Sequence, residues 1–85
     1  MFRIVFSNRA DRALDWFDTR TAQRIIAALD ALSTNPFFSR DVRKLRGELE
    51  GKYRLRVGRI RIVYEVLEEE AIIRVDDIAH RGSIY

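Results

Sequence analysis

Two adjacent stretches of alternating residues constrain the fold more than any other feature of this sequence. In residues 53–57 (YRLRV) and 60–66 (IRIVYEV), apolar side chains recur at every second position. Successive side chains of a β-strand point to opposite faces of the sheet, so each stretch predicts a strand with one apolar face. Arg54, Arg56 and Arg61 then point away from the core. We therefore expect a basic, concave floor on the uncovered face of the sheet.

The rest of the chain predicts three further strands and two helices. The expected strands are Phe2 to Phe6, Val42 to Arg46 and Ala71 to Ile78, the last following an acidic turn at residues 68–70. Together these segments indicate an α+β fold in which an N-terminal strand and a two-helix hairpin pack on a mainly antiparallel sheet.

Helical periodicity and capping residues locate the two helices. Ser7-Asn8 can cap a first helix over Arg9 to Asp18, and Thr21 is expected to cap a second that ends before Pro36. Apolar residues recur on one face of each helix. These residues are Ala10, Ala13, Leu14 and Phe17 in the first helix, and Ala22, Ile25, Ile26, Leu29 and Leu32 in the second.

Length and composition narrow the function classes. A chain of 85 residues has room for one domain, expected over residues 1–85. The absence of cysteine excludes disulfides, thiolate nucleophiles and Cys-based metal sites. No run is long enough to span a membrane, and the start MFRIVF lacks the features of a secretory signal. A cytoplasmic protein is the expectation.

Basic residues are concentrated in one part of the chain. The sequence pI is about 9.8, and residues 43–61 hold only two acidic residues, Glu48 and Glu50, beside many basic ones. Such clustering is typical of a protein that binds a polyanion, although solvated strand ends produce the same pattern. The basic residues of this stretch are Arg43, Lys44, Arg46, Lys52, Arg54, Arg56, Arg59 and Arg61.

The segment HRGSIY at residues 80–85 brings an imidazole, a guanidinium and a phenol close together in the sequence. It follows the last expected strand directly, so we expect that strand to deliver these groups to the same face as the arginines. His80 as an ordinary polar surface residue and Tyr85 as a hydrophobic clip remain alternatives. Tyr53, Tyr64 and Trp16 are expected to pack rather than to react.

The expected strands and the C-terminal segment, taken in their order along the chain, resemble the RelE/ParE toxin superfamily. The resemblance rests on residues 44–47 (KLRG), 53–58 (YRLRVG), 60–65 (IRIVYE), 80–81 (HR) and 84–85 (IY), and it covers the whole chain. It implies a RelE-like, microbial RNase-like fold. It also implies a type II toxin that cuts messenger RNA in the ribosomal A site without a metal or cofactor. A RelB-like antitoxin is expected to neutralise it in a toxin–antitoxin hetero-oligomer.

The resemblance also implies site residues. Arg61, Arg81 and Tyr85 correspond to the residues that carry cleavage, and the basic positions that bind RNA or phosphate correspond to Lys44, Arg46, Lys52, Arg54 and Arg56. Better-known bacterial members have lysines where this chain has Arg54 and Arg56, and arginine is a poor proton donor. Proton transfer must then rest elsewhere. His80 is one candidate, because an imidazole titrates near neutrality, and the resemblance implies Arg81 as the alternative.

Two other functions compete with RNA cleavage. A ParE-like inhibitor of DNA gyrase uses the same fold without cutting RNA, and a non-catalytic relative uses the basic face only to bind nucleic acid or an acidic peptide. The presence of Arg61, Arg81 and Tyr85 together favours the nuclease.

Overall fold

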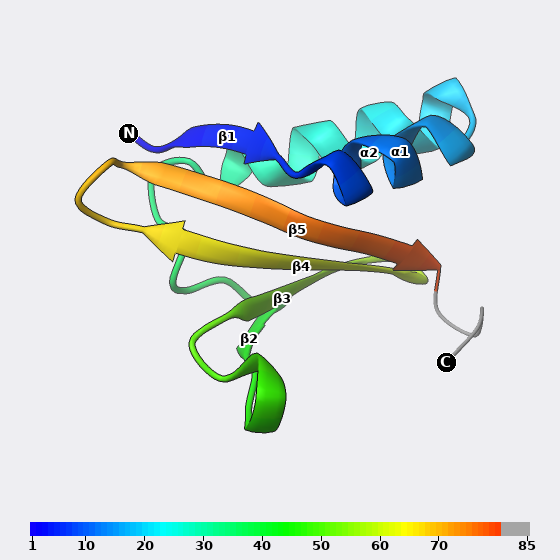
Figure 1. Ribbon diagram of the computed structural model, residues 1–85. Helices are drawn as coiled ribbons and strands as arrows, with labels where there is room; N and C mark the ends of the chain where they lie inside the picture. The colour runs from blue at the N-terminus through cyan, green and yellow to red at the C-terminus, as the bar shows by residue number, and fades with distance from the viewer. Residues whose placement is uncertain (81–85) are drawn as a thin grey trace.

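The computed structural model describes residues 1–80, which form two helices packed on one five-stranded sheet (Figure 1). This arrangement confirms the expected α+β fold. The elements are β1 (Arg3–Phe6), α1 (Asn8–Trp16), α2 (Thr19–Ala31), β2 (Val42–Lys44), the short 3-10 helix η1 (Gly47–Leu49), β3 (Tyr53–Val57), β4 (Ile60–Leu67) and β5 (Ile72–His80).

The sheet has the strand order β1-β5-β4-β3-β2. Strands β2 to β5 pair antiparallel with their neighbours, whereas β1 runs parallel to β5. The first strand of the chain therefore lies beside the last one. Both helices lie on the same side of the sheet (Figure 1), so the opposite side has no helical cover among the described residues.

One helix cap follows the sequence prediction and the other does not. Ser7 caps α1, because its hydroxyl accepts a hydrogen bond from the backbone N–H of Ala10 at 3.0 Å. Thr21 does not cap α2. The N-cap is Asp18, whose carboxylate accepts a hydrogen bond from the Thr21 N–H at 2.9 Å. A carboxylate is a strong acceptor for the free amides of a helix N-terminus, so α2 begins three residues earlier than expected.

The core lies between the helices and the apolar face of the sheet. Ile25 and Leu29 of α2 are buried there, as are Ile62, Tyr64 and Val75 of the sheet. Ile26 was expected to join them, but it is 42 % exposed. Ala28, next to Leu29 on the helix, packs against the core instead.

The Tyr64 side chain links the core to the loop after α2. Its hydroxyl donates a hydrogen bond of 2.7 Å to the carbonyl of Pro36, and its ring stacks on Tyr53 with centroids 5.6 Å apart. Burial raises the pKa of Tyr64 well above its usual value, with the neighbouring Tyr53 adding a smaller effect. Tyr64 therefore stays protonated and serves the core, as the sequence predicted.

A β-bulge interrupts the pairing of β4 with β5. The register changes between Val63 and Tyr64, which pair with Asp77 and Val75, so that Asp76 is an extra residue in β5. An extra residue reverses which face each later side chain occupies. The backbone of Ser7 donates to the Val75 carbonyl, and its hydroxyl to the Asp76 carbonyl, at 2.9 Å each. The bulge is thus tied to the junction of β1 and α1.

The structure also bears on membrane association. Within residues 1–80, neither helix combines the length and the apolar character needed to cross a bilayer.

Candidate nucleic-acid interface

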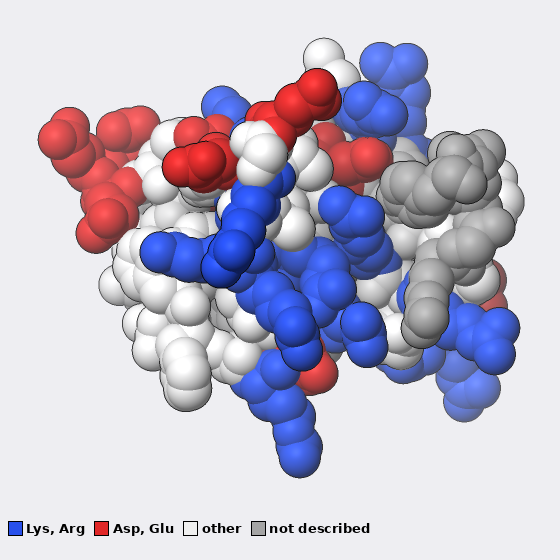
Figure 2. Space-filling model, turned by 90° about the horizontal axis from the view of Figure 1, so that it is seen from below, with Lys and Arg blue, Asp and Glu red and all other residues white. Residues whose placement is uncertain are grey.

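Four arginines from three adjacent strands lie together on the sheet face that the helices leave uncovered. In the register, Arg43 of β2 pairs with Arg54 of β3, and Arg56 of β3 pairs with Arg61 of β4. We call Arg43, Arg54, Arg56 and Arg61 the arginine cluster. Figure 2 shows Lys and Arg side chains gathered across the middle of this face. The alternation in the sequence therefore predicted the location of Arg54, Arg56 and Arg61 correctly.

Like charges that pair directly across two strands are unfavourable unless something neutralises them. Within residues 1–80, no carboxylate forms an ion pair with Arg43, Arg54 or Arg56. The Arg54 Nε is buried and has no hydrogen-bond partner among these residues. Burial lowers the pKa of Arg54, and the charges of Arg56, Arg43 and Arg61 lower it further. The cluster is thus suited to receive an anion.

A second group of charges on the sheet is neutralised by its own members. Arg74 of β5 forms ion pairs with Glu65 of β4 and, at 3.0 Å, with Asp76 at the bulge. The Lys52 ammonium lies 2.7 Å from the other carboxylate oxygen of Asp76. We call Lys52, Glu65, Arg74 and Asp76 the paired network. Lys52, expected to bind RNA, therefore has a carboxylate partner within the protein.

Two other expected RNA contacts lie apart from the arginine cluster. Lys44 pairs with Tyr53 in the register and so lies on the opposite face of the strand from Arg43. Arg46 follows β2, immediately before η1, and is exposed.

His80 does not lie where the sequence predicted. It is the last residue of β5 rather than part of a following loop, and it pairs with Ile60 on the helix-covered face. In a regular strand, alternation from Val75 would have placed it on the face of Arg61. The bulge at Asp76 reverses that alternation. The adjacent acidic residues Asp76-Asp77, which interrupt the apolar pattern of the strand, were the sequence signal for this change.

The other two residues expected to be catalytic, Arg81 and Tyr85, lie outside the described residues. Arg43, by contrast, was not among the expected site residues, although the structure places it opposite Arg54. Its strand is only three residues long, too short for an alternating pattern to show which face it occupies. As for metals, residues 1–80 contain no group of three His, Asp or Glu side chains placed to hold an ion.

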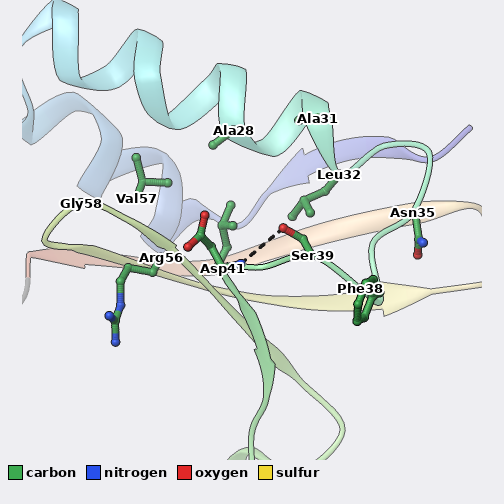
Figure 3. Close-up of a pocket in the computed structure, with 11 residues that line it drawn as sticks. Ala28, Ala31, Leu32, Asn35, Phe38, Ser39, Asp41, Arg56, Val57 and Gly58 are labelled. Carbon is green, nitrogen blue, oxygen red and sulfur yellow. Dashed lines mark hydrogen bonds between the residues drawn. The ribbon is translucent and has the colours of Figure 1, made fainter.

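A separate groove lies between α2 and β3, and Figure 3 shows Arg56 extending from β3 away from this helix. Its lining mixes apolar and polar residues, with Ala28 and Ala31 of α2 on one side and Val57 and Gly58 on the other. The guanidinium of Arg56 is therefore directed to the basic face and not into this groove.

Comparisons with known proteins agree on one family. Residues 4–85 match the family described as the ParE toxin of the type II toxin–antitoxin system parDE. A search of curated proteins found no match.

Solved structures of toxins from this superfamily have the same fold. The toxin–antitoxin complex RelBE2 from Mycobacterium tuberculosis contains a chain that is 27% identical, with a TM-score of 0.83 over 94% of this chain and 98% of that one. In the archaeal RelE–RelB complex from Pyrococcus horikoshii, the values are 26% identity and a TM-score of 0.80, over 96% and 97% of the two chains. The isolated E. coli RelE toxin shares the fold. It is 19% identical, with a TM-score of 0.82 over 96% of this chain and 86% of that one. The chain therefore belongs to the ParE toxin family of type II toxin–antitoxin systems, within the RelE/ParE superfamily.

Proposed function

We propose that this toxin is a metal-free endoribonuclease that cuts messenger RNA in the ribosomal A site. The observation that carries the proposal is the arginine cluster, in which Arg56 lies opposite Arg61 and Arg54 has a buried Nε with no described partner. Within residues 1–80, Arg43, Arg54 and Arg56 lie close together without forming an ion pair with a carboxylate. A phosphodiester would bring negative charge to these three cations.

The cluster suits the chemistry of RNA cleavage. In this reaction the 2′-hydroxyl loses its proton and attacks the adjacent phosphorus, the bond to the 5′ oxygen breaks, and the leaving oxygen takes up a proton. Negative charge grows on the non-bridging oxygens in the transition state. Guanidinium groups stay cationic and present a planar fork of donors, so Arg54, Arg56 and Arg61 are suited to stabilise that charge.

Proton transfer is assigned to the C-terminal residues. Tyr85 is proposed as the general base, because cations that bind the phosphate would also favour its phenolate. Arg81 and His80 were alternatives for protonating the leaving oxygen. The pairing of His80 with Ile60 on the helix-covered face counts against His80. Arginine is a poor proton donor, which counts against Arg81, so the two residues stay alternatives for this step.

Cleavage on programmed ribosomes tests this function. We expect the wild-type protein to cut messenger RNA in the A site and to act little on free RNA. Arg61→Ala, Arg81→Ala and Tyr85→Phe should each abolish cutting, whereas Arg12→Ala, an exposed residue of α1, should not. Cutting that survives all three site substitutions, or no cutting by the wild type, contradicts the proposal.

Inhibition of DNA gyrase is the second candidate, and the match to the ParE toxin family favours it. A supercoiling assay with purified gyrase separates the two functions. The nuclease proposal predicts no inhibition. Inhibition that persists in Arg61→Ala, Arg81→Ala and Tyr85→Phe, without RNA cleavage, supports the gyrase alternative.

We also propose that a RelB-like antitoxin neutralises this toxin in a hetero-oligomer in the cytoplasm. The similar chains from M. tuberculosis and P. horikoshii were crystallised in complexes with their antitoxins. Acidic residues of an antitoxin would complement the basic face, and an amphipathic helix would cover apolar surface. Copurification with a small acidic protein encoded beside the toxin is the expected result, and failure of every neighbouring candidate to bind contradicts it.

A further inference from the structure

The β-bulge places Asp77 on the same face of the sheet as the arginine cluster. Asp77 pairs with Val63 of β4, and Arg61 is its diagonal neighbour on that strand. If the pairing of β4 with β5 continued without the extra residue, Asp77 would lie opposite Ile62, which is fully buried. Burial of an unpaired carboxylate is costly, so the bulge brings this charge to the uncovered face instead.

A carboxylate at this position can compete with RNA for the cluster. Diagonal neighbours on one face of a sheet lie within reach of long side chains, and opposite charges attract there. Strands β4 and β5 hold three carboxylates, of which Glu65 and Asp76 belong to the paired network. Asp77 is the third. An ion pair between Asp77 and Arg61 would occupy a guanidinium that the proposed function assigns to the phosphate.

Two contacts hold the Asp77 carboxylate on the other side of β5. Its Oδ1 accepts a hydrogen bond of 2.9 Å from the backbone N–H of Ile78 and lies 3.5 Å from the Nε of Arg9. Arg9 comes from the first turn of α1, which follows β1 directly, and β5 lies between β1 and β4 in the sheet. Arg9 therefore attracts the carboxylate towards the β1 side, whereas Arg61 would attract it towards β4.

We propose that Arg9 is a positioning residue that holds the Asp77 carboxylate on the β1 side of β5, so that Asp77 does not compete with RNA for the arginine cluster. Arg9 acts through Asp77 and does not itself need to contact RNA. Because the Arg9 side chain is 78% exposed, the pair adds little to stability, and its effect is to direct a charge. The inference rests on the proposed function, because it takes the arginine cluster as the site of the phosphate.

Removal of Arg9 should weaken RNA binding without slowing the chemical step. An internal competitor has to be displaced before the substrate binds. Arg9→Ala should therefore raise the half-saturating toxin concentration in single-turnover cleavage on ribosomes about two- to fivefold and leave the maximal rate unchanged. Fluorescence anisotropy with a 2′-O-methyl hexanucleotide, which cannot be cleaved, should show a similar loss of affinity. The loss should shrink at high salt, which screens exposed charges.

Neutralising Asp77 separates this role from a direct contact between Arg9 and RNA. Asp77→Asn keeps an oxygen that can accept the hydrogen bond from the Ile78 N–H but carries no charge. The double variant Arg9→Ala/Asp77→Asn should therefore bind RNA as tightly as Asp77→Asn alone. Asp77→Ala in the same pair of backgrounds repeats the test, and urea unfolding checks that each variant is folded.

Arg12→Ala is the matched control, because it removes an exposed cation from the same helix, and it should weaken binding less than Arg9→Ala. The proposal is overturned if the two variants bind equally well, or if Arg9→Ala/Asp77→Asn binds as weakly as Arg9→Ala. It is also overturned if the wild type binds no RNA. The expected pattern of binding without cleavage on ribosomes refutes the proposed function and leaves the positioning role standing.

Discussion

The sheet carries two groups of charges that differ in how they are neutralised. In the paired network, Lys52 and Arg74 each contact Asp76, and Arg74 also contacts Glu65. In the arginine cluster, cations face cations across the strands. The first arrangement is complete within the protein, whereas the second places like charges opposite each other, which is unfavourable without a neutralising partner. This difference is why we propose the arginine cluster, and not the paired network, as the ligand site.

The largest expected effect comes from removing one cation from each group. Arg54→Met should reduce ribosome-dependent cleavage about 100-fold, since it removes a donor to the transition state. It should also stabilise the protein by about 0.5–1 kcal/mol, because a like-charge cross-strand pair is lost.

Lys52→Met is the matched control, because it removes the same charge from the paired network. It should destabilise the protein by about 1 kcal/mol through loss of a charged contact, with a much smaller effect on cleavage. Urea unfolding and single-turnover cleavage of both variants provide the measurements. The comparison fails if the two variants change stability in the same direction.

Removing the shared carboxylate should break the paired network as a whole. Asp76→Ala leaves Lys52 and Arg74 without that partner, and we expect a loss of about 1–2 kcal/mol in the free energy of unfolding. Chemical denaturation measures it, with Glu69→Ala in the exposed turn as a control that should change little. A loss no larger than that of the control would mean that the network adds nothing to stability.

A change on the helix-covered face sharpens the comparison by affecting stability alone. Tyr64→Phe removes the hydrogen bond to the buried Pro36 carbonyl and should cost about 1–2 kcal/mol without altering RNA binding. The raised pKa of Tyr64 has a further consequence. Below pH 10 both folded and unfolded tyrosine are protonated, whereas above about pH 10 only the unfolded state ionises.

The wild type should therefore lose part of its stability as the pH rises above about 10, and Tyr64→Phe should lose less over the same range. Thermal unfolding between neutral and alkaline pH measures the difference. Parallel pH profiles for the two proteins would show that ionisation of Tyr64 is not coupled to folding.

The smallest effect is expected for an isolated surface ion pair. Arg9 lies 3.5 Å from Asp77, and its side chain is 78% exposed. Arg9→Ala should change the free energy of unfolding by less than about 0.5 kcal/mol, since exposed pairs are screened by water and salt. A loss as large as that of Asp76→Ala would mean that burial does not distinguish the paired network from an ordinary surface contact.

Sequence reasoning succeeded where the structure depends on residues that are adjacent along the chain. Alternation within residues 53–57 and 60–67 correctly placed Arg54, Arg56 and Arg61, because side-chain direction in a regular strand is fixed locally. The bulge at Asp76 is different. Its hydrogen bond from Ser7 and its contact with Lys52 join segments far apart in the chain, so the expectation that the last strand delivers His80 to the arginine face could not take the bulge into account.

The candidate site shows the same limit. The sequence revealed that basic residues are concentrated between positions 43 and 61, but not which of them have partners. The partner of Lys52 lies on β5, and the neighbour of Arg43 is known only once β2 is paired with β3. The order of strands in the sheet distinguishes the arginine cluster from the paired network, and a local sequence pattern does not reveal that order.

The parallel pairing of β1 with β5 has a consequence for synthesis of the toxin. A ribosome releases Arg3–Phe6 well before Ile72–His80, yet within the described residues the only strand beside Arg3–Phe6 is Ile72–His80. During synthesis β1 must therefore wait, unpaired, until β5 has emerged. A chain cut short before β5 lacks the strand that pairs with both β1 and β4. We therefore expect an interrupted round of translation to yield a fragment with an incomplete core instead of a folded toxin.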